Sequence, residues 1–179
     1  GYTAGSEANG FYATLITTGG NSFIYTYDNS TGGIPGTGAT EGIAFNSSKK
    51  IVFSCRFKGD SSGNWTVGIG TDTNANWYTA STSSTGDRAV FAYDGSTFYS
   101  ITDSGSAVTR NSITATVTNW NTLRIEFDPA SQVRFYLNGT LVQTHTTNLP
   151  DTGTVLIGSG HSTGGRTYRM TSPTISIEL

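Results

Sequence analysis

The segment from residue 120 to residue 150 constrains the fold most, because its strands, its turns and its pairing register can all be predicted. Residues 123–127 and 133–137 alternate strictly between apolar and polar side chains, which is the pattern of strands with one buried face. Asn138 and Gly139 then give the strongest short signal for a two-residue hairpin turn. The segment is therefore predicted to be a three-stranded antiparallel meander.

The register of this meander follows from the turn and from matching the apolar faces of the strands. Across the Asn-Gly turn, we predict four facing pairs: Tyr136–Leu141, Phe135–Val142, Arg134–Gln143 and Val133–Thr144. Across the preceding turn, we predict three: Ile125–Phe135, Glu126–Arg134 and Arg124–Tyr136. One face should be core, and the other should carry an ion pair and an arginine on a tyrosine ring.

Composition indicates an almost entirely β protein. Helices favour glutamate and lysine on exposed faces, yet the 179 residues include only four glutamates and three lysines, beside 23 glycines. Short alternating runs recur between turns rich in Gly, Asn and Asp, which predicts a two-sheet sandwich or a barrel. The other predicted strands cover residues 11–16, 23–27, 43–45, 49–57, 66–70, 88–93, 98–102, 111–117, 155–158 and 174–179. Residues 28–40 and 71–87 are predicted loops.

The net charge and the lengths of the apolar runs argue against two classes of partner, and the single cysteine has a predicted core position. The net charge is −2 and the sequence has no basic run, so no nucleic-acid partner is expected. No apolar run approaches the ~20 residues that span a bilayer, so no membrane partner is expected either. The single cysteine, Cys55, alternates in phase with Phe53 and Phe57 and is predicted to lie in the core.

Four phrases of the sequence carry a family resemblance. WNTLRIEF (120–127), VRFYLNGTLVQTHTTNLP (133–150) and SPTISIEL (172–179) resemble the second half of concanavalin A-like jelly rolls, the fold of laminin-G domains, lectins and glucanases. FAYDGSTFYSITDSG (91–105) resembles the variant found in bacteriophage virion and tail-fibre proteins. The resemblance implies an all-β, two-sheet antiparallel concanavalin A-like jelly-roll sandwich. We expect residues 1–179 to form one such domain, although the resemblance does not extend over residues 1–40.

Enzymes of this kind offer two patterns to compare. The glucanases carry paired carboxylates on one strand, whereas here Glu126 is predicted to pair with Arg134 and Asp128 opens an Asp-Pro turn. Alginate-lyase-like sheets present Gln-x-His, Arg and Tyr; Gln143-Thr144-His145 gives that spacing, with Arg124 and Tyr136 on the predicted outer face. The other motifs of these enzymes are absent. No catalytic residue is therefore assigned, and the chain is expected not to be an enzyme.

No metal site or cofactor is expected. Asp72, Asn74 and Asn76 have the spacing of a calcium loop, but Trp77 replaces the glycine of the turn and Ser83 the closing glutamate. The two histidines, His145 and His161, are far apart and have no partner at zinc spacing.

Four residues are candidates for binding a ligand. Trp77 and Tyr78 lie in an otherwise polar loop, where their rings could stack on a sugar or anchor the loop to the sandwich. Arg124 and Tyr136 share the outer face of the meander. Three other features are predicted to be structural: Trp65 and Trp120 as core anchors at sheet edges, and residues 166–169 as a solvated turn rather than a pocket wall.

We therefore expect a non-enzymatic structural or attachment module of a virion or tail fibre, located on the virion or extracellularly. A glycan ligand and other virion or self subunits, including a homo-oligomer, are the expected partners. Two alternatives remain open. One is a glycosidase or lyase acting on polysaccharides, and the other is a carbohydrate-binding module of a larger secreted protein.

Overall fold

The fold is described by a computed structural model for residues 2–7, 10–17, 20–24, 45, 48–71, 86–129, 131–152, 155–161 and 166–178. Side chains are described for residues 45, 48–71, 86–129, 131–152, 155, 169–171 and 173–177. Within these ranges the chain forms strands and turns. No helix long and apolar enough to cross a membrane occurs in the described part of the chain.

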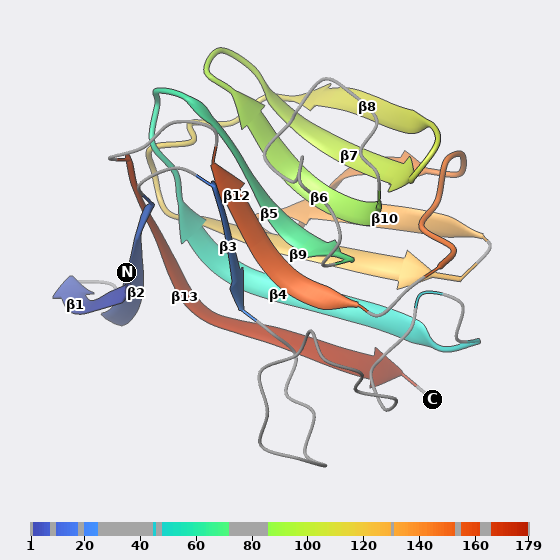
Figure 1. The fold of residues 1–179 in the computed structure, drawn as a ribbon, viewed down its shortest axis with the longest axis horizontal. Coiled ribbons are helices and arrows are strands. Elements are labelled where there is room, and N and C mark those ends of the chain that lie inside the picture. The colour runs from blue at the N-terminus through green and yellow to red at the C-terminus, as the bar shows by residue number, and fades with distance from the viewer. Residues whose placement is uncertain are drawn as a thin grey trace.

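In the part of the chain that the structure describes, thirteen strands form two antiparallel sheets that pack face to face (Figure 1). In spatial order, the seven-stranded sheet consists of β1 (Tyr2–Glu7), β2 (Gly10–Thr17), β13 (Arg166–Glu178), β4 (Lys50–Lys58), β9 (Asn121–Asp128), β10 (Gln132–Leu137) and β11 (Thr140–His145). The six-stranded sheet consists of β3 (Gly20–Ile24), β12 (Leu156–His161), β5 (Asn64–Gly70), β6 (Asp87–Asp94), β7 (Phe98–Ser104) and β8 (Val108–Ile113). The predicted all-β jelly-roll sandwich is confirmed.

The core lies between the sheets and is built from the apolar side of each alternating strand. Phe135 on β10 meets Phe91 on β6 edge to face, with ring centroids 5.3 Å apart. Trp65, which is 1% exposed, packs with its ring centroid 4.8 Å from that of Phe57. Cys55 is also buried in this core, and burial raises the pKa of its thiol. The core positions predicted for Trp65 and Cys55 are confirmed.

The predicted register of the meander is confirmed on one side and corrected on the other. All three predicted pairs between β9 and β10 occur. At the turn, Asn138 and Gly139 have φ of 52° and 83°, the left-handed values that favour Asn-Gly, and Tyr136 pairs with Leu141 as predicted.

Beyond that pair, an irregularity between Phe135 and Tyr136 shifts the register by one residue. Phe135 then pairs with Gln143 instead of Val142, and Val133 pairs with His145 instead of Thr144. Because strand side chains alternate in direction, one extra residue reverses which face the remaining residues of β11 present. Gln143 and His145 therefore point between the sheets.

Other strand boundaries also differ from those predicted. β1 was not predicted, and β8 begins at Val108 rather than at residue 111. β13 begins at Arg166, so residues 166–169 form a strand rather than a solvated turn; they pair with β2, and Arg169 also pairs with Lys58 of β4. Phe45, predicted to end a strand, lies in a turn and is buried, with its ring centroid 5.3 Å from that of Phe127.

Candidate functional site

The outer face of the seven-stranded sheet carries a concentration of positive charge. Alternate residues of β4, β9, β10 and β13 point away from the core, and six of them are basic. We call this surface the cationic face; its basic residues are Lys50, Arg56, Lys58, Arg124, Arg134 and Arg169. These are six of the ten lysines and arginines in a chain whose net charge is −2.

Arg124 and Tyr136, two of the predicted ligand-binding residues, lie together near the middle of the cationic face. They are cross-strand partners on β9 and β10, and the guanidinium carbon of Arg124 is 5.5 Å from the centroid of the Tyr136 ring. The Arg124 side chain is 44% exposed, so its donors can reach a ligand. The predicted contact is confirmed.

Glu126 organises the charges around this pair. Its carboxylate is 7% exposed and forms ion pairs with Arg124, with Arg134 at 3.0 Å and with Lys50 at 3.8 Å. The Tyr136 hydroxyl also donates a hydrogen bond to it, at 3.2 Å. The predicted pair with Arg134 is thus confirmed as part of a larger network that fixes the orientation of Arg124 and Tyr136.

The second carboxylate on this part of the face is Asp128. It pairs with Arg134 at 2.9 Å and accepts a hydrogen bond from the Gln132 amide at 3.2 Å. Both described carboxylates of the face therefore lie among Lys50, Arg124 and Arg134 and already have cationic partners. A general acid or a nucleophile needs a carboxyl oxygen that can face the substrate, whereas these carboxylates face basic side chains.

Trp120 lies on the cationic face, which corrects its predicted role as a core anchor. The guanidinium carbon of Arg56 is 5.4 Å from the centroid of its ring, and the indole is half-buried. Trp120 is two residues before Thr122, an outward-facing partner of Arg56. The strand alternation therefore continues one residue beyond β9 and turns the indole outward. The face thus presents two arginine–aromatic pairs.

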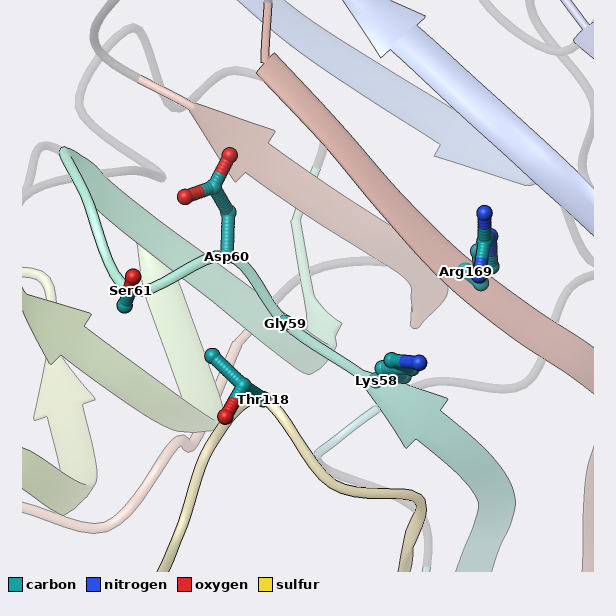
Figure 2. A pocket seen from close by; sticks show the side chains of 6 residues that line it. All are labelled: Lys58, Gly59, Asp60, Ser61, Thr118 and Arg169. Carbon is teal, nitrogen blue, oxygen red and sulfur yellow. The ribbon is translucent and has the colours of Figure 1, made fainter.

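A pocket of about 270 Å³ opens at the end of the cationic face near Arg56 and Trp120. It is lined by Lys58, Gly59, Asp60, Ser61, Thr118 and Arg169 (Figure 2). In Figure 2 the Lys58 and Arg169 side chains lie on one side of the pocket and Asp60 on the other. Lys58 and Arg169 are direct cross-strand partners.

The loop that forms the other wall of this pocket is held by its own contacts. The Asp60 carboxylate accepts hydrogen bonds from the Ser62 amide at 2.9 Å and from its hydroxyl at 2.6 Å. A Cβ at Gly59 would lie 2.5 Å from the Trp65 ring, so this position requires glycine for the loop to pass over the indole. Sequence patterns did not predict this pocket, because its lining comes from three separate parts of the chain, at residues 58–61, 118 and 169.

Gln143 and His145, the lyase-like pair, do not lie on the outer face as predicted. His145 is 1% exposed; its Nε2 is 2.9 Å from the Ser100 hydroxyl and its Nδ1 is 2.9 Å from the Thr102 hydroxyl. Burial lowers the pKa of His145 to about 4. The side-chain carbonyl of Gln143 accepts a hydrogen bond from the side-chain amide of Asn111 at 3.4 Å. These residues join the edges of the two sheets.

On the outer face of the six-stranded sheet, outward side chains of the middle strands β6 and β7 are buried. Val90, Ala92 and Ile101 are 0% exposed, as is the ion pair between Arg88 and Asp103. Burial lowers the pKa of Arg88, and the Asp103 carboxylate opposes that shift. A ligand cannot reach these residues without displacing what buries them, whereas the Arg124 side chain on the cationic face is 44% exposed.

An exposed basic residue nevertheless lies at the edge of the six-stranded sheet. Arg110 on β8 has its guanidinium carbon 4.0 Å from the centroid of the Tyr99 ring. This arginine–tyrosine pair repeats the chemistry of Arg124 and Tyr136 on the opposite sheet. It therefore provides a matched control for experiments on the cationic face.

Several predicted features lie outside the described residues. Trp77 and Tyr78, the calcium-like spacing at residues 72–76, and the side chains of His161 and Arg166 are among them. Within the described side chains, no three His, Cys, Asp or Glu residues are grouped so as to hold a metal ion.

Comparison with known proteins gives matches at the level of structure only. No protein-family model and no curated protein sequence matches the chain. Among similar solved structures, a Caenorhabditis elegans galectin (LEC-6) has a TM-score of 0.51 and 12% identity, covering 91% of this chain and 95% of the galectin. The Bacillus subtilis carbohydrate-binding module CBM66 has a TM-score of 0.53 and 12% identity, covering 98% of this chain and 92% of the module.

An enzyme shares the same architecture. The alginate lyase AlgAT5, of polysaccharide lyase family 7, has a TM-score of 0.56 and 10% identity, covering 98% of this chain and 82% of the lyase. Identities this low show a shared jelly-roll fold. Because that fold hosts both binding modules and enzymes, function has to be argued from the cationic face.

Proposed function

We propose that this chain is a non-enzymatic glycan-binding module that attaches a virion or tail fibre to a host surface. The observation that carries the proposal is the pair of arginine–aromatic contacts, Arg124 on Tyr136 and Arg56 on Trp120, on one accessible sheet face. Aromatic rings pack against the apolar faces of sugars, and guanidinium groups donate hydrogen bonds to their hydroxyls. The fold shared with a galectin and a carbohydrate-binding module supports this reading.

The non-enzymatic part of the proposal rests on how the titratable groups are used. Glu126 and Asp128 are held in ion pairs, and His145 is enclosed between the sheets with both ring nitrogens beside hydroxyl groups. None of these groups is placed to exchange a proton with a ligand on the cationic face. The module would then act by holding its ligand rather than by transforming it.

The attachment setting rests on the phage-like phrase at residues 91–105 and on multivalency. A face that offers two arginine–aromatic pairs would bind one glycan weakly. Several copies on one particle would raise the avidity by orders of magnitude. We therefore also propose that the chain works as a homo-oligomer or beside other virion subunits, on the virion or outside the cell.

The test is a glycan array followed by titration calorimetry with the ligand found. Arg124→Ala and Trp120→Ala should each weaken binding about tenfold, or ~1.4 kcal/mol, while Arg110→Ala on the opposite sheet should bind like wild type. Trp77→Ala examines the alternative loop site, and circular dichroism confirms folding of each variant. A loss confined to Trp77→Ala would move the site to the loop. Absence of any glycan ligand would overturn the proposal.

A further inference from the structure

The cationic face points to the chemical class of its ligand. We propose that the ligand is an acidic glycan, whose carboxylate or sulfate group lies between Lys58 and Arg169 in the pocket of Figure 2. The inference rests on the glycan-binding function proposed above. It adds the charge of the ligand and the place where that charge is held.

Charge is distributed unevenly along the face. The described carboxylates, Glu126 and Asp128, form their ion pairs with Lys50, Arg124 and Arg134. The other three basic residues, Arg56, Lys58 and Arg169, lie toward the pocket. There the described carboxylate is that of Asp60, which accepts two hydrogen bonds from Ser62 and lies on the opposite wall. Two basic side chains, Lys58 and Arg169, therefore line the pocket beside one described carboxylate.

The pairing of Lys58 with Arg169 is itself informative. Like charges directly opposite each other on neighbouring strands destabilise a sheet, and this pair occupies adjacent outward positions of β4 and β13. An anion bound between Lys58 and Arg169 would contact both cations at once. Binding energy for an acidic group is thus available at a position where a neutral sugar would gain little.

The shape of the pocket suits one acidic group rather than a whole chain of sugars. Its volume is about 270 Å³, and the Ser61 and Thr118 side chains line the wall facing the cations. Lys58 supplies a compact charge, and Arg169 supplies the planar donors that match a carboxylate or sulfate. Trp120 lies along the face toward Arg124, so the attached sugars can continue over its ring.

The length of the face sets the size of the ligand. Ser54, the cross-strand partner of Arg124, is four residues from Lys58 along β4, which corresponds to about 13 Å of strand. A ligand that contacts both Arg124 and the pocket must therefore be an oligosaccharide of several units. The acidic group would occupy the pocket, and the neutral part would cross Trp120 toward Tyr136.

The experiment compares alginate oligosaccharides, heparin oligosaccharides and neutral dextran by calorimetry on the full chain, at low and at physiological ionic strength. The acidic ligands should bind, and their affinity should fall as salt increases. Lys58→Gln and Arg169→Gln should each weaken acidic-glycan binding about tenfold. Arg110→Gln should bind like wild type, and Lys58→Arg should recover most of the lost affinity.

The possible failures are distinguishable. Tight, salt-independent binding of neutral glycans that is unaffected by Lys58→Gln would overturn the acidic-ligand inference and leave the glycan-binding function standing. Failure to bind any glycan would overturn both. Equal affinity for a random-sequence DNA duplex and for heparin would show a general polyanion surface, which would also contradict the inference. Circular dichroism of each glutamine variant excludes misfolding as the cause of a loss.

Discussion

Phe135 and Glu126 lie on neighbouring strands with their side chains on opposite faces of the same sheet. Phe135 is 0% exposed in the core, so Phe135→Ala should lower the free energy of unfolding by about 3–5 kcal/mol. Glu126→Gln removes charge from hydrogen-bonded ion pairs whose basic partners remain partly hydrated, and should cost about 2 kcal/mol. Urea unfolding followed by circular dichroism measures both values.

Equal, small losses at the two positions would contradict this assignment of faces. The register predicted from the sequence was sufficient to pair Glu126 with Arg134. It could not include Lys50, because β4 becomes the neighbour of β9 only through the topology of the whole sheet. An isolated surface pair would contribute at most about 1 kcal/mol, so the larger expected cost at Glu126 comes from that additional neighbour and from burial.

His145 should make stability depend on pH. Its pKa is lowered from 6.5 to about 4 by burial, so the folded state favours the neutral ring. The stability contributed by this difference is fully present above pH 6.5 and is lost as the pH falls toward 4. The whole loss should be about 3 kcal/mol, since one pKa unit corresponds to 1.36 kcal/mol.

Urea unfolding between pH 7 and pH 4 measures this effect. His145→Gln should be less stable at pH 7 and should show a shallower decline with acid, because the ring that the fold holds neutral is no longer present. An unchanged slope in His145→Gln would mean that the ring is not held neutral by the fold.

Glycine positions make a test at the level of the strand. A Cβ at Gly68, within β5, would lie 2.5 Å from the Ala89 carbonyl oxygen. Gly68→Ala should therefore push β5 away from its neighbour β6 and lower the free energy of unfolding by about 3 kcal/mol. Gly139 has φ of 83° but open space around it, so Gly139→Ala should cost about 1 kcal/mol from backbone strain alone. Thermal unfolding of the two variants should give this order, and the reverse order would rule out the close packing of β5 on β6.

Strand prediction succeeded where local chemistry decides the structure. The Asn-Gly turn fixed the first pairs of the β10–β11 hairpin, and the alternating faces fixed β9 against β10. The irregularity between Phe135 and Tyr136 was not predictable, because the sequence on either side alternates without interruption. Its cause is tertiary: with the shift, His145 reaches Ser100 and Thr102 on the other sheet.

The strand formed by residues 166–169 shows the opposite case. These residues follow a Gly-rich stretch, and they read as a turn by composition. They become strand because β2 lies on one side of them, and Arg169 also pairs with β4. Long-range pairing therefore overrides local preference here, as it does in many sheets. The same pairing places Arg169 beside Lys58 and creates the pocket.

At the scale of the molecule, the proposal that the chain is not an enzyme can be tested directly. Purified protein incubated with β-glucan, agarose or alginate should release no reducing ends and no unsaturated sugars. This outcome follows from Glu126, Asp128 and His145 being held in structural contacts. Robust turnover that is abolished by Glu126→Gln or by His145→Ala would instead establish the polysaccharide-degrading alternative. Turnover caused by a contaminating enzyme would remain in preparations of both variants.

The cationic face also belongs to this scale, since its basic residues are spread from residue 50 to residue 169. These residues do not form a basic run in the sequence, and this is why the sequence predicted no nucleic-acid partner. The fold gathers them because outward positions of four neighbouring strands meet in register. Alternation predicted the outward direction of Arg124 and Arg134, but not which strands would lie beside them.

The connections of the first strands bear on how the protein is made. β2 pairs with residues 166–170 of β13, and β3 pairs with β12 (Figure 1). A chain emerging from the ribosome therefore exposes these early strands until more than 130 later residues have been translated. Pairing between strands so far apart in sequence is slow, and until it occurs the unpaired strands can associate with other chains. Production in cells should accordingly depend on chaperones that cover residues 2–24, with soluble yield improving as translation and growth temperature are slowed.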